Sequence, residues 1–430
     1  MSILSGMETL IITAVILLLT ASWRLYQKRK YYRGVTSKLP TVYGIPFIGI
    51  VYKMLDVNKI FHNFHIKHVL TSSEFFNKAE EVYKHFQNGV FNGLIVAPAK
   101  KWKADRKIIS TFLAHNNNVA WIPAFNSISL KNKLERLVGQ GEQDIYTIIK
   151  STYAFKLFGV AFLSRTPHYN RVRKYLKDLV QSLTKKHLAQ QLESEAMNNV
   201  VEDKQAMVDI TVKAMRQGLF SEKQVVVEGF TMLAASYETS AAVLYTCMLM
   251  LAMHPEIQER VFQEIRSVFP IEVISVEYED LKKLPYLDMF FSEALRLAPP
   301  ISFIARKTAQ DSEICPGVIL PKGAQIAISI YELHRRKEIW GPDASRFNPD
   351  NFLPENIVKR HPYSYMPFSK GARNCLGFRY AEISLRIAVI HAVRSLKFST
   401  TFKYEDIVHV PHISLRYKVQ PPLSIEVRAN

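Results

Sequence analysis

The chain has 430 residues, of which 48% are hydrophobic and 11% aromatic, so it can bury a large core and does not have the composition of a disordered protein. Its formal charge of +18 raises the question of a nucleic-acid partner, but no RNA- or DNA-binding motif accompanies the charge, and we expect none. Three cysteines without zinc-type spacing exclude a disulfide framework and indicate a reducing compartment. The basic surface then suits membrane lipids or an acidic partner protein.

An apolar stretch without any charged residue runs from Thr9 to Trp23. Together with the residues before it, the stretch approaches the roughly 20 residues that a membrane-spanning helix needs. Arg24, Lys28, Arg29 and Lys30 follow it, whereas the leader before Glu8 has no Lys or Arg. The pattern favours an uncleaved anchor over residues 1–23, with the body of the protein on the cytosolic side, and disfavours a cleaved signal peptide.

Proline and glycine recur over residues 39–49, which predicts a stiff, extended hinge. We assign residues 24–54 to a basic linker and hinge and residues 55–430 to one main domain. Apolar positions three and four apart predict helices there, over residues 55–64, 100–113, 169–188, 223–253, 255–269, 286–298 and 381–396. Short strands are expected at 318–320, 324–328, 413–417 and 423–427. The fold class is therefore mostly α with small peripheral β-sheets.

The most specific pattern of the chain is FSKGARNCLG, from Phe368 to Gly377, just before the last predicted helix. A thiolate at Cys375 would gain from the positive end of that helix and from backbone N–H groups. Thiolate is the ligand that favours O–O cleavage at haem iron. The planar guanidinium of Arg373 can donate two parallel hydrogen bonds to a carboxylate. A lone cysteine is more often buried and structural.

The spacing Phe-x-x-Gly-x-Arg-x-Cys-x-Gly nevertheless resembles the haem loop of the cytochrome P450 (haem-thiolate monooxygenase) family. The resemblance implies the cytochrome P450 fold, with the haem between a long distal helix and a proximal helix. It also implies that Phe368, Arg373, Cys375 and Gly377 bind haem b, and that Cys375 is the axial ligand of its iron.

A second pattern joins Glu293 and Arg296, which share a helix face three residues apart. Alone it would be an exposed ion pair worth about 0–1 kcal/mol. Further on, the segment from Phe347 to Phe352 resembles the family's Phe-x-Pro-x-Arg-Phe motif, whose Arg completes a buried cluster with the Glu and the Arg. Asn351 stands at that position here, so the cluster Glu293, Arg296 and Asn351 would lack one charge.

The segment AASYETS, from Ala234 to Ser240, lies inside a long apolar helix. A threonine there usually bonds back to a carbonyl one turn earlier, and a glutamate is usually exposed. The segment also resembles the family's oxygen-activation stretch over the distal haem face. By that resemblance Thr239 steadies dioxygen and its protonation, and Glu238 feeds protons from solvent. Ser236 replaces the glycine that usually opens the helix at this point.

Trp102 and Arg106 are four residues apart and share a helix face, which alone is equally typical of an amphipathic surface helix. By resemblance to the family's Trp-x-x-x-Arg, both face a haem propionate, Arg106 as a charge and Trp102 through its indole N–H. Arg306, after the Pro299-Pro300 corner, matches another arginine that faces a propionate. His62, His65 and His68 recur every three residues without a nearby carboxylate or cysteine, and we interpret them as surface or interfacial histidines.

The resemblance covers nearly the whole chain, which is several dozen residues shorter than microsomal members. Two strands that should follow the first helix in this family are missing around residues 65–73. The segment between residues 169 and 228, which covers the substrate pocket in the family, is shorter than expected. Losing two strands would leave an unpaired sheet edge.

The resemblance is to insect microsomal members of the fatty-acid-hydroxylase-like clan. It implies a monooxygenase of the endoplasmic reticulum membrane that inserts one oxygen atom of O2 into a small apolar substrate, which would be a fatty acid, an insect hormone or a xenobiotic such as an insecticide. NADPH would supply electrons through NADPH-cytochrome P450 reductase, with cytochrome b5 as a second electron donor. A truncated, non-catalytic haem protein, a haem-thiolate isomerase and a basic, membrane-anchored interaction protein without haem remain as alternatives.

Overall fold

The computed structural model describes residues 63–80, 82–83, 93–127, 134–146, 206–270, 274–315, 317–411 and 414–428, with a few single residues near 20–26 and 178–189. The predicted hinge, nearly all of the predicted anchor and most of the helix expected at 169–188 therefore lie outside the described residues. Within the described part, no single helix has the length and hydropathy of a membrane span. One pair of helices bent by 112°, Glu222–Met253 with Pro255–Val268, meets those criteria by length and composition only.

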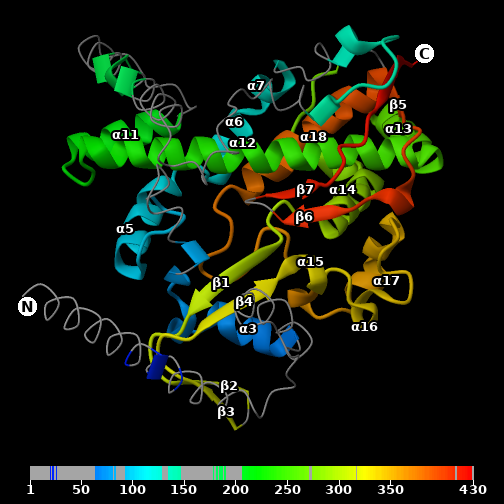
Figure 1. The fold of residues 1–430 in the computed structure, drawn as a ribbon. Coiled ribbons are helices and arrows are strands. Elements are labelled where there is room, and N and C mark those ends of the chain that lie inside the picture. The colour runs from blue at the N-terminus through cyan, green and yellow to red at the C-terminus, as the bar shows by residue number, and fades with distance from the viewer. Residues whose placement is uncertain are drawn as a thin grey trace, which may run out of the picture.

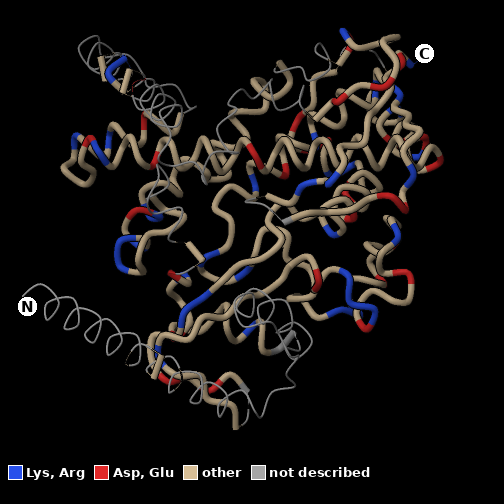
Figure 2. The backbone as a smooth tube through the Cα atoms, in the orientation of Figure 1, with Lys and Arg blue, Asp and Glu red and all other residues tan. Residues whose placement is uncertain are grey.

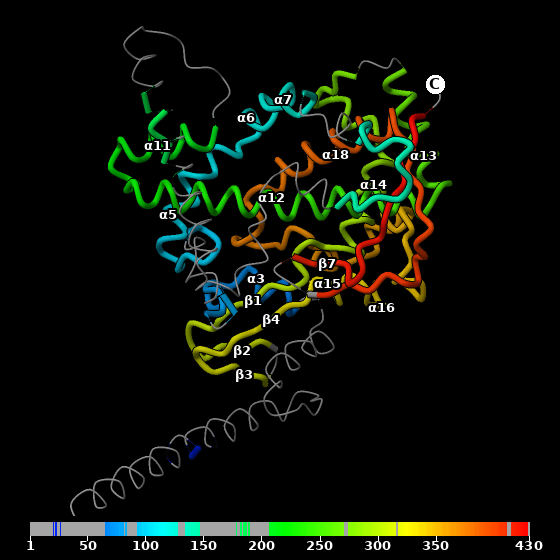
Figure 3. Tube along the Cα trace, turned by 45° about the horizontal axis from the view of Figure 1, so that its top comes forward, coloured from blue at the N-terminus to red at the C-terminus, as the bar shows by residue number. Residues whose placement is uncertain are grey.

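A helix of 32 residues, α12 (Glu222–Met253), crosses the whole molecule in both views of the chain (Figures 1 and 3). Its first turn is fixed by a capping box, in which the Ser221 hydroxyl accepts from Gln224 N–H and the Gln224 side chain accepts from Ser221 N–H. All residues from 241 to 252 are buried, so this stretch packs against the rest of the protein around its whole circumference and forms the centre of the core. Pro255 starts the next helix directly after His254.

The main core packs around α12. One continuous hydrophobic cluster includes Leu244 of α12, Val261 of α13 (Pro255–Val268), Phe290 of α14 (Pro285–Leu297) and Ile390 of α18 (Phe378–Ser395). The remaining described helices are α3 (Asn63–Thr71), α5 (Ala99–Ile109), α6 (His115–Ala120), α7 (Ile122–Ser127), α11 (Met207–Arg216), α15 (Ile330–Leu333), α16 (Lys337–Trp340) and α17 (Pro354–Ile357).

The strands of the described part form four antiparallel pairs. These are β1 (Phe303–Lys307) with β4 (Gln325–Ser329), β2 (Ser312–Cys315) with β3 (Val318–Leu320), β5 (Leu396–Ser399) with β8 (Ser424–Val427), and β6 (His409–Pro411) with β7 (Leu415–Tyr417). In the longest pair, Phe303 lies opposite Ser329 and Lys307 opposite Gln325. The β1–β4 and β2–β3 pairs lie below α12 in Figure 1. A mostly helical fold with small sheets is thus confirmed.

One local prediction needs correction. The first helix was expected to end at residue 64, but α3 occupies Asn63–Thr71, so the stretch taken as a bare connection is helical. The strands expected at 318–320 and 324–328 do lie on either side of a turn, as β3 and β4, and each pairs with a different, earlier strand.

The segment after α3, where two strands were expected to be missing, pairs with β1 at one point. An isolated bridge joins Asn77 to Lys307, whose N–H donates to the Asn77 carbonyl at 2.8 Å. The same region also contacts β1 through side chains: Ala305 N–H donates to Tyr83 OH at 3.3 Å, and Lys307 Nζ donates to Glu80 Oε2 at 3.0 Å.

Candidate functional site

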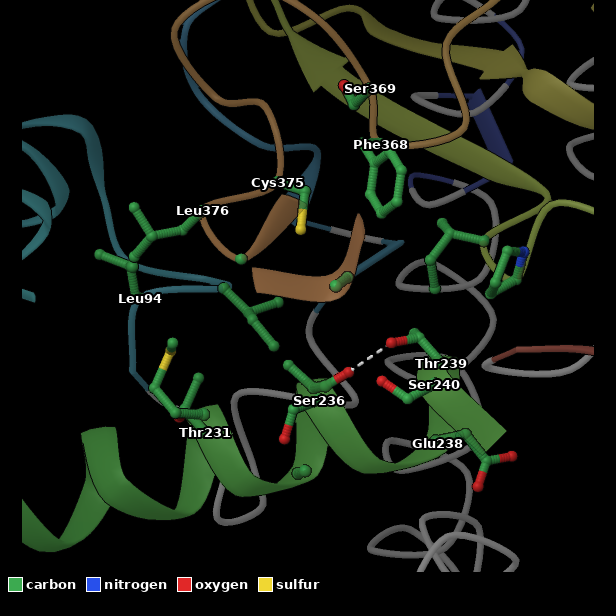
Figure 4. Close-up of a pocket in the computed structure, with 18 of the residues that line it drawn as sticks. Leu94, Thr231, Ser236, Glu238, Thr239, Ser240, Phe368, Ser369, Cys375 and Leu376 are labelled. Atoms are coloured by element: carbon green, nitrogen blue, oxygen red, sulfur yellow. Dashed lines mark hydrogen bonds between the residues drawn. The ribbon is translucent and has the colours of Figure 1, made fainter. Parts of the chain in front are cut away.

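A cavity of about 1270 Å³ lies between α12 and the loop that precedes α18. Thr239 and Ser240 line it from α12, Phe368 and Cys375 from the loop, and Trp102 from α5. Figure 4 shows the Cys375 sulfur directed into the space between the loop and α12, with the hydroxyls of Thr239 and Ser240 on the far side. Two of the patterns found in the sequence, more than 100 residues apart, therefore face each other across one cavity.

The loop carrying Cys375 is a tightly hydrogen-bonded turn. Cys375 N–H donates to the Phe368 carbonyl at 2.8 Å, and Asn374 N–H donates to the Gly371 carbonyl at 3.1 Å. Gly371 has φ +76°, and a Cβ at this position would lie 2.0 Å from the Leu70 carbonyl oxygen of α3. Only glycine can occupy a left-handed position this close to another backbone. The turn is therefore packed on α3 as well as joined to α18.

The environment of the thiol differs from the sequence-based expectation. Burial raises the pKa of Cys375, and the Gly377 N–H group and the charge of Arg106 only partly oppose that rise. In the protein alone the thiol is therefore favoured, although the side chain is exposed toward the cavity. A metal ion bound to the sulfur would reverse this, because a coordinating thiol loses its proton.

Arg106 holds the same loop from α5. Its Nη1 donates to the Asn374 carbonyl at 2.8 Å and its Nη2 donates to Asn374 Oδ1 at 2.7 Å. The face of the buried Trp102 ring lies 5.1 Å from the Arg106 guanidinium and 4.4 Å from that of Arg373. Cation–π contacts thus order two arginines at the cavity wall beside the cysteine.

The cations around this wall have no carboxylate partner among the described residues. Arg373 donates Nη2 to the Ala97 carbonyl at 2.9 Å, while its buried Nε and Nη1 have no hydrogen-bond partner there. Burial and then the charges of Arg306 and Arg106 lower the pKa of Arg373 to about 9. Burial and then Arg306 and Arg373 lower the pKa of Lys78 to about 7.

Cations that are buried or half-buried and repel one another fit a site that receives an anion. The two propionate carboxylates of a haem would supply two negative charges, so this wall passes the test of fit for that group. Arg306 takes part only through its charge: it is buried in β1, donates Nη1 to the Ala305 carbonyl at 3.1 Å, and is not part of the cavity wall.

On the opposite wall, Thr239 Oγ1 donates to the Ala235 carbonyl at 2.8 Å, the ordinary back-bond of a helical threonine. Its oxygen can still accept a hydrogen bond from the cavity. Ser236 likewise donates to the Leu233 carbonyl at 3.1 Å. Both residues line the cavity, and α12 is continuous at this point, where the family's glycine would open the helix.

Glu238 is buried, where an isolated pattern would have it exposed, and in Figure 4 its side chain points away from Thr239 and the sulfur. Its Oε1 accepts from Ser414 Oγ at 2.8 Å and from Arg416 Nη2 at 3.1 Å, and Tyr146 OH approaches at 3.4 Å. Burial is the main reason that the pKa of Tyr146 is raised, followed by the charge of Glu238. Glu238 is therefore held in an ion pair with Arg416 at the cavity wall.

The second predicted constellation forms a separate cluster around a fully buried ion pair. Arg296 donates Nε and Nη2 to the two Glu293 oxygens at 2.7 and 2.6 Å, and neither side chain is exposed to solvent. Asn351 Nδ2 donates to Glu293 Oε1 at 3.1 Å, so Asn351 joins the pair as the family resemblance implies. The pair is therefore not the exposed ion pair that the spacing alone would favour.

Several residues of the site carry no sequence signal that singles them out. Lys78 is one lysine among many, and Arg416 and Ser414 lie near the C-terminus, where the sequence predicts only a short strand. His334 is fully buried: Met366 N–H donates to its Nε2 at 2.9 Å, and its Nδ1 lies 3.1 Å from the Arg296 carbonyl. It connects the Glu293 cluster to the start of the cysteine loop, which only the folded chain reveals.

The histidine repeat shows no metal site in the part that the structure describes. His65 and His68 of α3 are half-buried, and His62 lies outside that part. No group of three His, Cys, Asp or Glu side chains gathers as metal ligands among the described residues.

One cysteine that faces a large cavity, a wall of cations and a long helix opposite define a haem-thiolate protein as the class that fits. The family model described as cytochrome P450 matches residues 143–418, and the chain belongs to this family. It is a cytochrome P450 monooxygenase, and the family implies haem with a thiolate ligand.

The relatives are insect proteins. The chain is 30% identical to probable cytochrome P450 313a4 of Drosophila melanogaster, covering 94% of this chain and 96% of the relative. It is 31% identical to probable cytochrome P450 313a2 of the same species, covering 84% and 82%. The first alignment extends over 477 positions, more than the 430 residues here, so that relative has residues without a counterpart in this chain.

The solved structures agree on the fold. A retinoic-acid-bound cyanobacterial protein, CYP120A1, superposes with a TM-score of 0.70 at 22% identity, over 85% of this chain and 88% of the other. A second cytochrome P450, CYP102L1, gives the same TM-score at 18% identity, over 86% and 88%.

Proposed function

We propose that the protein binds haem b through Cys375 and oxidises a small apolar substrate in the cavity above it. The cavity carries this proposal, because it combines the cysteine, the wall of cations and a largely apolar lining that includes Leu94, Ile95 and Val243. A haem bound there would supply the redox and oxygen chemistry. Phe368 and Gly377 bound the loop on either side of the sulfur, and Phe368 accepts the Cys375 N–H.

The remaining residues prepare the site. We assign the propionate side to Arg373, Arg106 and Trp102, with Arg306 adding charge from behind. Thr239 would accept a hydrogen bond at the distal side, and Glu238 would pass protons inward from the Ser414 and Arg416 side. The Glu293, Arg296 and Asn351 cluster would hold the segment that leads to the cysteine loop.

The substrate class is a fatty acid, an insect hormone or a xenobiotic.

We propose NADPH-cytochrome P450 reductase as the source of electrons, with cytochrome b5 as a second donor. Five lysines and arginines lie between residues 100 and 107 on α5, close to the cysteine loop (Figure 2), and would suit an acidic partner. We further propose residues 1–23 as an anchor and 24–54 as a hinge, with the body on the cytosolic side of the endoplasmic reticulum membrane.

A non-catalytic haem protein is the second candidate, because Thr239 is bonded back to Ala235 and Glu238 is held in an ion pair. The full-length chain with haem and reductase in phospholipid vesicles separates the two. We expect NADPH oxidation that depends on an apolar probe such as a medium-chain fatty acid, together with a product that contains one oxygen atom from O2. A correctly assembled haem protein without product for any apolar probe would support the second candidate and contradict the proposal.

Thr239→Val tests the distal assignment, because it keeps the shape and removes the hydroxyl. Product formation should fall by about 10- to 100-fold, in the range of a lost proton-transfer group, while the haem spectrum is kept. Thr246→Val is the matched control on the same helix, since Thr246 pairs with Tyr417 OH at 3.0 Å and does not line the cavity. Equal product formation in both variants would remove Thr239 from the mechanism.

A further inference from the structure

The Glu293 cluster contains a neutral residue close to a buried charge. Besides the two bonds from Arg296, the Glu293 carboxylate accepts from Asn348 N–H at 2.8 Å and from Asn351 Nδ2 at 3.1 Å. Both of these donors are uncharged. Arg296 is therefore the one cation in direct contact with the carboxylate among the described residues.

The surroundings of this pair are rich in electron density. Arg296 gives its other hydrogens to three backbone carbonyls, those of His334, Ala344 and Arg346, at 2.7, 2.6 and 3.0 Å. The ring of Trp340 lies 4.9 Å from the same guanidinium. Carbonyl oxygens and an aromatic face both attract positive charge. A further cation can therefore be accommodated near Arg296 without a second carboxylate.

Arg360 approaches this pocket from the loop after α17. Its guanidinium lies 4.2 Å from the centre of the Trp340 ring and 5.5 Å from that of Phe352. Its Nη2 donates to the Asn351 carbonyl, and the side chain is half-buried. The pKa of Arg360 is lowered first by burial, is raised by the charge of Glu293 and is lowered by that of Arg296, so Arg360 interacts electrostatically with both.

We propose that Arg360 is a positioning residue that supplies the second cation of the Glu293 cluster, from nine residues beyond the neutral Asn351. The cation stacks on Trp340 and Phe352 and fixes the Asn351 backbone through its carbonyl. The neutral residue at 351 is thus compensated within the same segment of the chain.

The contacts of Arg360 extend to the cysteine loop. The Phe352 ring, on which Arg360 stacks, lies 4.8 Å from the ring of Tyr365. Tyr365 OH donates to the Ser292 carbonyl at 3.0 Å, and the next residue, Met366, donates its N–H to His334. Phe368, two residues further, accepts the N–H of Cys375. Arg360 therefore positions the segment from which the cysteine loop departs.

The test compares Arg360→Lys with Arg360→Gln in the full-length chain supplied with haem. Gln keeps a donor for the Asn351 carbonyl but has no charge, whereas Lys keeps the charge and the contact with Trp340. We expect Arg360→Gln to lower the thermal unfolding midpoint by about 2–5 °C and to convert part of the long-wavelength carbon monoxide band to the shorter-wavelength form. Arg360→Lys should keep more of both. Lys359→Met, at the exposed neighbouring position, is the matched control and should change neither.

A suppressor sharpens the test. Asn351→Arg, introduced together with Arg360→Gln, returns a cation to the cluster from the other position and should restore the midpoint and the band. The role of Arg360 is refuted if Arg360→Gln matches the control, or if it loses no more than Arg360→Lys. It is also refuted if Asn351→Arg folds normally alone but does not rescue Arg360→Gln. If Asn351→Arg does not fold, the test rests on whether Arg360→Gln lowers the unfolding midpoint more than Arg360→Lys does.

The spectral readout rests on the haem binding proposed above, whereas the unfolding midpoint does not. Absence of any thiolate band in the unsubstituted chain refutes haem binding. If Arg360→Gln has an unfolding midpoint as high as that of Arg360→Lys, the role of Arg360 is refuted, whether or not haem is bound.

Discussion

Gly371 has the most constrained backbone position in the cysteine loop. Its φ of +76° disfavours any side chain, and a Cβ would lie 2.0 Å from the Leu70 carbonyl oxygen. We expect Gly371→Ala to lower the free energy of unfolding by about 2–4 kcal/mol, from the backbone conformation and the forced separation of the loop from α3 together. Chemical denaturation measures the change.

Gly139 provides the matched control for this prediction. Its φ is +75°, almost the same, and a Cβ there would meet nothing within 4 Å. Gly139→Ala should therefore show only the backbone part of the loss, about 1 kcal/mol. Equal losses in the two variants would mean that the loop does not need its close approach to α3.

At the scale of an element, the buried pair on α14 contrasts with an exposed pair of the same spacing. Glu293→Gln leaves Arg296 buried without a countercharge, and we expect a loss of about 3–5 kcal/mol in the free energy of unfolding, with poor yield of folded protein. Glu279→Gln removes the partner of Lys282, an exposed pair three residues apart, and should have no measurable effect. Similar denaturation curves for both variants would contradict the structural role of the cluster.

His334 links α14 to the segment before the cysteine loop and makes that link sensitive to acid. Burial, chiefly, lowers its folded-state pKa to about 3 from an ordinary value of 6.5. The unfolded chain therefore binds the proton more readily, so the stabilisation is complete above pH 6.5 and is lost as the pH falls toward 3. The expected loss is about 1.4 kcal/mol per pH unit, or about 2 kcal/mol between pH 6.5 and 5.

The measurement compares wild type with His334→Gln, because other groups titrate in the same range. His409, whose pKa is also lowered to about 3, adds a slope of the same sign, and Glu228, raised to about 7, adds one of opposite sign. These contributions cancel in the difference between the two proteins. The destabilisation caused by His334→Gln should be about 2 kcal/mol smaller at pH 5 than at pH 7. A difference that does not change with pH would show that His334 is not buried as a neutral ring.

The elements differ in how well the sequence predicts them. Regular apolar spacing and Pro255 were enough to predict α12, α13 and α14 to within a residue or so. The pairing of the short strands was not predictable, because β3 and β4 each pair with a strand that precedes them and their length leaves little periodicity to read.

Over the whole molecule, the residues that carry a fixed spacing were predictable and those that act through long-range contacts were not. The spacing around Cys375, Thr239 and Glu293 identified both walls of the cavity and the buried cluster. No local pattern indicates that Lys78 joins the cations of the cavity wall. The burial of Glu238 was not expected either, because its partner Arg416 is 178 residues further along the chain.

The most direct test of the whole account is the absorption spectrum of the full-length protein supplied with haem, reduced and exposed to carbon monoxide. We predict the long-wavelength Soret band of thiolate-ligated haem, its loss in Cys375→Ala, and its retention in Cys247→Ala, where the substituted cysteine is buried in α12. Folded protein that shows no such band with haem in excess, or that keeps the band in Cys375→Ala, would contradict the account.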